Sequence, residues 1–182
     1  MITVAGGDSH IWGSELSDSP HGGPDGYSRN TFTALLAENN YICAAYPGIG
    51  NKEILRRVID ACEQLIYSDI KHSVVVLWTW PGRDNKINSN NEILELQDFL
   101  ELHSIPYLFT CADNCVITGK LDYTNWFLFP PATEEWNTTT PRGFYQWAVE
   151  NKYECGPEHH PLERAHRDAA NLMKAKIGRA HV

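Results

Sequence analysis

Short apolar runs alternate with amphipathic stretches along this chain, and the alternation predicts an α/β fold. Runs suited to strands begin near residues 1, 41, 73 and 105, and each is followed by apolar residues at helical spacing. The clearest helical stripe follows Asn51, and the β-branched run at 73–78 is typical of a central strand covered on both faces. We therefore expect one parallel sheet between two layers of helices.

The last third of the chain gives a weaker pattern. Residues 126–129 predict either a short fifth strand or a buried loop, which Pro130 and Pro131 end. Apolar residues at helical spacing predict one helix after Pro141 and a last one from about Pro161. Proline is favoured at the first position of a helix, so His160 is expected at the cap of the last helix.

Length and composition indicate one globular domain. The chain has 182 residues, of which 42% are hydrophobic and 21% charged, and we assign residues 1–176 to a single domain. The net charge of −8 argues against nucleic acid as the main partner. No signal-peptide pattern and no run of membrane-spanning length is found, which predicts a cytoplasmic protein without a membrane partner. The oligomeric state is left open.

Two further features of composition affect the interpretation. The five cysteines are odd in number and scattered, as expected of reduced thiols in the cytoplasm, although Cys111 and Cys115 leave a metal or a disulfide open. Residues 177–182 look like one reading frame of a sequencing-adapter oligonucleotide. We treat these six residues as a non-native tail and exclude them from the fold prediction.

Polar residues follow the first strand at Gly6-Gly7-Asp8-Ser9. The two glycines permit a sharp turn and leave room beside Ser9 for another molecule. Ser9 is therefore a candidate nucleophile, and the alternative is a serine that caps a turn. Near the other end, His160 precedes Pro161, where its ring is expected to face a cleft.

With Gly-Asp-Ser after the first strand and His-Pro before the last helix, the chain resembles the SGNH, or GDSL-type, hydrolases. The resemblance implies a three-layer α/β/α sandwich with a flavodoxin-like, five-stranded parallel sheet of order 2-1-3-4-5. It also implies that Ser9 is the nucleophile, that His160 is its base, and that no cofactor or metal is needed. In that family a glycine N–H of the second sequence block joins the serine N–H in the oxyanion hole. We carry this role to Gly50 before Gly48.

The chain departs from the family pattern at two places. The third block lacks its asparagine, so Asn51, Thr79 or Arg83 is the candidate side-chain oxyanion donor. The aspartate three residues before the histidine is replaced by Pro157, which makes Glu158 the candidate acid and leaves a backbone carbonyl as the alternative.

The remaining candidates concern substrate and metal. Asp8, His10, Thr79, Trp80 and Arg83 are assigned to substrate binding, the alternative for the last two being a packed rim. A metal site formed by His159 or His160 with His166 and Cys155 is considered and not adopted, because its ligands would mix loop and helix positions.

The predicted activity is that of a serine hydrolase of the esterase or deacetylase type. It would cleave a small-molecule or glycan ester through an acyl-enzyme on Ser9. The alternative is a non-catalytic module that binds a glycan or another ligand on the same fold.

Overall fold

A four-stranded parallel sheet organises the molecule. The computed structural model describes residues 1–19, 26–37, 40–132 and 140–180. The strands are β1 (Ile2–Gly6), β2 (Tyr41–Cys43), β3 (His72–Trp78) and β4 (Tyr107–Cys111), in the order β2-β1-β3-β4. In this register Val4 lies opposite Ile42 on one side and Val74 on the other. The predicted α/β class and the strand order 2-1-3-4 are confirmed.

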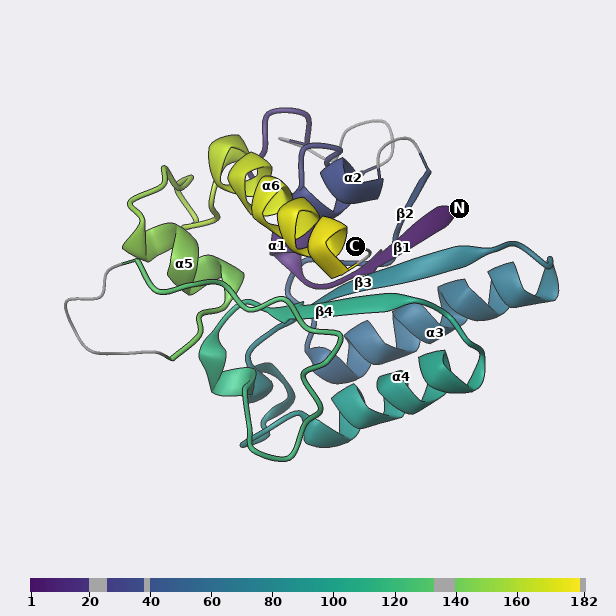
Figure 1. Cartoon of the computed structure of the whole chain (residues 1–182). Coiled ribbons are helices and arrows are strands. Elements are labelled where there is room, and N and C mark those ends of the chain that lie inside the picture. The colour runs from purple at the N-terminus through teal and green to yellow at the C-terminus, as the bar shows by residue number, and fades with distance from the viewer. Residues whose placement is uncertain (20–25, 38–39, 133–139, 181–182) are drawn as a thin grey trace.

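Helices cover both faces of the sheet (Figure 1). Helices α3 (Asn51–Tyr67) and α4 (Asn90–Leu102) cover one face, and α2 (Phe32–Ala37) and α6 (Glu163–Ala180) cover the other. The short helix α1 (Ser9–Trp12) and α5 (Phe144–Glu150) lie toward the carboxyl ends of the strands, together with the 3₁₀ turns η1 (Pro81–Asp84) and η2 (Asn114–Val116). Ligands of such sheets bind at this edge.

Two apolar cores result from the alternation of side chains along the strands. Val4, Val74 and Val76 pack with the buried stripe of α3 and with α4. Ala5 and Leu77 point the other way and pack with residues of α2, α5 and α6. The helical stripe expected after Asn51 is thus confirmed as a core face.

The expected fifth strand is not confirmed. Among the described residues, Trp126 forms a single parallel bridge with Phe109 of β4, and the flanking bonds Phe109 N–H to Asn125 O and Phe127 N–H to Phe109 O are both 2.8 Å. Phe129 then pairs antiparallel with Arg142. The chain turns away from β4 after one bridge, because Phe129 takes a different partner just before Pro130 and Pro131.

The last helix begins later than predicted, at Glu163 rather than at Pro161. Pro161 forms an antiparallel bridge with Cys155, and Leu162 N–H donates to Glu154 O at 3.0 Å. This pairing holds the residues after His160 extended, so His160 lies in a loop and not at a helix cap. Residues 177–180 continue α6, and 181–182 lie outside the described residues.

Two further observations concern the thiols and the polarity of the helices. All five cysteines are free, with Cys62 and Cys111 buried. Of the helices in the described ranges, none is both long and apolar enough to cross a membrane.

Candidate active site

The turn after β1 presents Ser9 at the start of α1. Gly7 has a φ of 156°, and a Cβ on it would lie 2.4 Å from the Ile11 side chain, so glycine is required there. The Asp8 carboxylate caps the helix by accepting a hydrogen bond from His10 N–H at 3.0 Å. Ser9 is thereby fixed as the first helical residue, with only 6% of its surface exposed.

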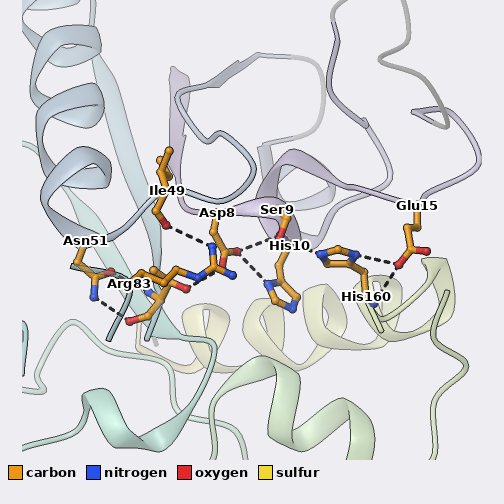
Figure 2. A network of polar contacts seen from close by, with 9 residues as sticks. Asp8, Ser9, His10, Glu15, Ile49, Asn51, Arg83 and His160 are labelled. Carbon is orange, nitrogen blue, oxygen red and sulfur yellow. Dashed lines mark hydrogen bonds and ion pairs between the residues drawn. The ribbon is translucent and has the colours of Figure 1, made fainter. Parts of the chain in front are cut away.

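Ser9, His160 and Glu15 form a continuous chain of side-chain contacts (Figure 2). His160 Nε2 lies 2.8 Å from Ser9 Oγ, and His160 Nδ1 lies 2.8 Å from Glu15 Oε2. An ionised Glu15 can only accept, so Nδ1 carries the proton and Nε2 is free to accept the Ser9 hydroxyl proton. The two residues singled out at opposite ends of the sequence are thus brought together in the arrangement of a catalytic triad.

The carboxylate that contacts the His160 ring belongs to Glu15 and not to the candidate acid Glu158. Glu158 is exposed, and its backbone N–H donates to Glu15 Oε1 at 2.9 Å. His160 N–H also donates to Glu15, at 3.1 Å. Glu15 reaches this position from a left-handed backbone with a φ of 70°, and Gly156 leaves room because a Cβ there would lie 2.5 Å from its carboxylate.

The pKa of Glu15 is lower than usual. Partial burial alone would raise it, but hydrogen bonds from Glu158 N–H and from the ring and N–H of His160 outweigh burial and stabilise the carboxylate. A lowered pKa in the folded state means that the unfolded chain binds this proton first as the pH falls. The stabilisation is complete above the unfolded pKa of about 4.3 and is lost as the pH falls through the lower folded value.

We therefore expect the free energy of unfolding to fall between pH 7 and pH 3, partly through Glu15. Urea unfolding at a series of pH values measures this slope. Glu15→Gln cannot ionise, so the slope of this variant should be smaller than that of the wild type below about pH 4.3. Equal slopes for both proteins would contradict the assignment of a lowered pKa to Glu15.

A second cluster of polar contacts surrounds Asp8, whose side chain is fully buried. Its carboxylate lies 2.9 Å from His10 Nδ1, accepts the Thr79 hydroxyl at 2.7 Å, and lies 3.4 Å from Arg83. Complete burial would raise the pKa of Asp8, but His10, Thr79 and Arg83 outweigh it and hold this pKa well below its usual range. Asp8 and Thr79 are thus buried supports of the site rather than surfaces open to a substrate.

Asn51 has a structural role in this network, and the prediction of an oxyanion-stabilising amide is wrong. Its Nδ2 donates to Thr79 O and to Ser89 Oγ, each at 2.7 Å, and its Oδ1 accepts from Thr79 N–H at 2.8 Å. Both amide hydrogens are therefore used, and the side chain is fully buried. Asn51 fixes the backbone of Thr79 just after β3.

Asn51→Ala should accordingly lower stability much more than turnover. The change leaves a buried N–H, a carbonyl and a hydroxyl without partners, and each such group costs about 1–3 kcal/mol, so a total of roughly 3 kcal/mol or more is expected. Urea unfolding measures the loss, with exposed Asn91→Ala on α4 as the matched control. A stable Asn51→Ala protein with a greatly reduced kcat would instead restore the oxyanion role.

The turn that contains Gly48 and Gly50, just before α3, is partly covered by the carboxylate of Asp84. A Cβ on Gly50 would lie 2.2 Å from Asp84 Oδ1, and Asp84 Oδ2 accepts from Lys52 N–H at 3.1 Å. Asp84 thus caps the first turn of α3, next to Gly50, to which the resemblance assigned an oxyanion-hole N–H. Gly48 is exposed, has a φ of 77°, and has open space where a Cβ would lie.

Trp80 and Arg83 belong to the rim of the site. The Arg83 side chain is 28% exposed, donates to Ile49 O at 3.3 Å, and lies over the Trp80 ring at 5.5 Å. Figure 2 shows its guanidinium group beside Asp8, the residue that precedes Ser9 in the sequence. Arg83 therefore brings a positive charge to the edge of the site, next to the glycine turn.

His166 and the other candidate metal ligands do not form a metal site. The His166 ring is buried between Phe32 and Phe144, and its Nδ1 accepts from Phe32 N–H at 3.2 Å. Burial lowers the pKa of His166 to about 3, which keeps the ring neutral as that bond requires. In the part of the chain that the structure describes, no group of three or more potential ligands is arranged to hold a metal ion.

Comparison with known proteins adds no assignment: no protein-family model matches the sequence, and no curated protein does. The features of the molecule that bear on function are its fold and the geometry of Ser9, His160 and Glu15.

Proposed function

We propose that this protein is a serine hydrolase of the SGNH type that cleaves carboxylic esters, as an esterase or deacetylase. The observation that carries the proposal is the contact chain from Ser9 Oγ through His160 to Glu15, with two distances of 2.8 Å. The sheet order 2-1-3-4 and the position of Ser9 directly after β1 support it. In this proposal the segment at Trp126, beside β4, takes the place of the fifth strand of the family.

The chemistry has two steps, each with His160 as the proton carrier. Ser9 Oγ attacks the ester carbonyl while His160 Nε2 takes the hydroxyl proton, and His160 then gives that proton to the leaving alkoxide. Water next attacks the acyl-enzyme carbonyl while His160 takes its proton. The bond between the acyl carbon and Ser9 Oγ then breaks, the acid leaves, and His160 returns the proton to Ser9 Oγ. Glu15 keeps Nδ1 protonated and stabilises the imidazolium that forms in both steps.

The oxyanion is stabilised by groups at the carboxyl edge of the sheet. Ser9 N–H has no acceptor in the described part of the chain, because it is the first amide of α1. The further candidates for this stabilisation are the backbone of the turn at Gly48 and the guanidinium of Arg83, which donates to Ile49 O and pairs with Asp8. Asn51 is not part of this set.

Labelling with a fluorophosphonate tests the proposal directly, since only an activated serine reacts rapidly with it. We expect one label per chain, located at Ser9 by mass spectrometry. His160→Ala should slow labelling by at least about a hundredfold, because the base that activates the hydroxyl is lost.

His159→Ala is the matched control for this experiment, because His159 is exposed and adjacent in sequence. Its labelling rate should equal that of the wild type. A folded protein that is not labelled at Ser9 would contradict the proposal and favour the non-catalytic ligand-binding module.

A further inference from the structure

His10 is a buried histidine with one ring nitrogen left over. Its side chain is 5% exposed, and Nδ1 lies 2.9 Å from Asp8 Oδ1. Nε2 is buried and has no hydrogen-bond partner among the described residues. A buried polar atom without a partner costs about 1–3 kcal/mol, so an unpaired nitrogen beside a proposed active site requires an explanation.

The contact with Asp8 decides what this nitrogen can bind. Asp8 is held ionised by its three neighbours, so His10 Nδ1 must donate the hydrogen bond between them. In the neutral ring Nε2 then bears a lone pair and acts as an acceptor. Its partner must therefore carry an O–H or N–H group.

Aromatic rings from three separate segments surround the His10 ring. Trp80, Tyr145 and His160 have ring centroids 6.0, 5.8 and 5.3 Å from that of His10. All three are partly exposed, whereas the His10 ring beside them is buried. Among such rings a neutral hydroxyl is a more favourable partner than an ammonium group, which would lose its hydration.

The contact between the His10 and His160 rings places His10 on the side of the site where the alcohol part of the ester would leave. His160 delivers its proton to the departing alkoxide, so the alcohol part of the ester lies against the His160 ring. Figure 2 shows the His10 ring beside that of His160, with its second nitrogen pointing away from Asp8. A hydroxyl on the carbon next to the leaving oxygen would therefore be the part of the substrate nearest to the His10 ring.

We propose that His10 Nε2 is a subsite that accepts a hydrogen bond from a second hydroxyl of the leaving alcohol, so that the substrates are esters of vicinal diols or polyols. This inference rests on the proposed hydrolase function and adds the class of alcohol to it. Two acetates of equal backbone test it: 2-hydroxyethyl acetate carries the hydroxyl, and 2-methoxyethyl acetate replaces its proton with a methyl group.

The first measurement does not depend on hydrolysis. In Ser9→Ala protein with ¹⁵N-labelled histidine, the Nε2 resonance of His10 should indicate an unprotonated nitrogen. It should shift saturably on addition of 2-hydroxyethyl acetate and stay constant with 2-methoxyethyl acetate. A protonated Nε2, or one that neither ester changes because an internal water already occupies it, overturns the proposal.

The second measurement is kinetic. Wild-type kcat/KM should be roughly tenfold higher for the hydroxy ester, the effect of one net hydrogen bond of about 1.4 kcal/mol, and the ratio should approach one in His10→Phe. Hydrolysis of both esters at equal rates by the wild type contradicts the subsite and leaves the hydrolase proposal intact. A saturable shift in a wild-type protein that hydrolyses neither ester supports the subsite and contradicts the hydrolase proposal.

Discussion

Replacing Ser9 with alanine is expected to lower kcat for p-nitrophenyl acetate by a factor on the order of 10⁵–10⁶. The nucleophile and its base act as a unit, so removing either one removes nearly all covalent catalysis. The fold should remain, because Ser9 Oγ hydrogen-bonds to the His160 ring and the helix cap is supplied by Asp8. Initial rates under saturating ester measure the loss of catalysis, and thermal unfolding shows whether the fold is retained.

Ser68→Ala is the control for the Ser9 experiment. Ser68 is exposed at the end of α3, where its hydroxyl donates to Gln64 O. This variant should keep the wild-type kcat. If Ser9→Ala retained the wild-type rate while folded, Ser9 would not be the nucleophile.

Glu15→Gln is expected to lower kcat by about 10³–10⁴ with a much smaller change in KM. The neutral side chain cannot stabilise the imidazolium of His160. Its NH₂ group would also face one of the N–H groups of Glu158 or His160 that now donate to the carboxylate. Steady-state kinetics at pH 8 measures the loss under conditions in which the wild-type carboxylate is ionised.

Glu158→Gln is the matched control for Glu15→Gln. Glu158 lies in the same loop, is exposed, and contacts Glu15 only through its backbone N–H, which the substitution retains. Its kcat should therefore equal that of the wild type. The reverse result, with Glu158→Gln inactive and Glu15→Gln active, would exchange the roles of the two carboxylates.

Local patterns in the sequence account for the parts of the fold and site that were predicted. The apolar stripe of α3 and the run at 73–78 each depend on neighbouring residues, so their periodicity identifies them. Ser9, Gly48 and Arg83 follow β1, β2 and β3, and the carboxyl ends of parallel strands meet at one edge of the sheet.

The missed features depend on contacts between distant segments. Glu15 follows no motif, and its carboxylate meets His160 across 145 positions of sequence. Gly156 makes room for this carboxylate, but a single glycine in a loop does not indicate which side chain lies beside it. Asn51 was misassigned because its partner is the backbone of Thr79, whose position no side-chain pattern reveals.

The position of Glu15 also affects the order in which the proposed site is completed during synthesis. Nucleophile and acid belong to one short segment, residues 9–15, and only the base comes from the other end of the chain. A nascent chain that has emerged as far as residue 150 carries Ser9 and Glu15 but lacks the His160 ring that joins them, so the proposed site is incomplete in it. If the proposed hydrolase function holds, turnover during refolding should begin only after the loop that carries Glu158 and His160 has packed against Glu15.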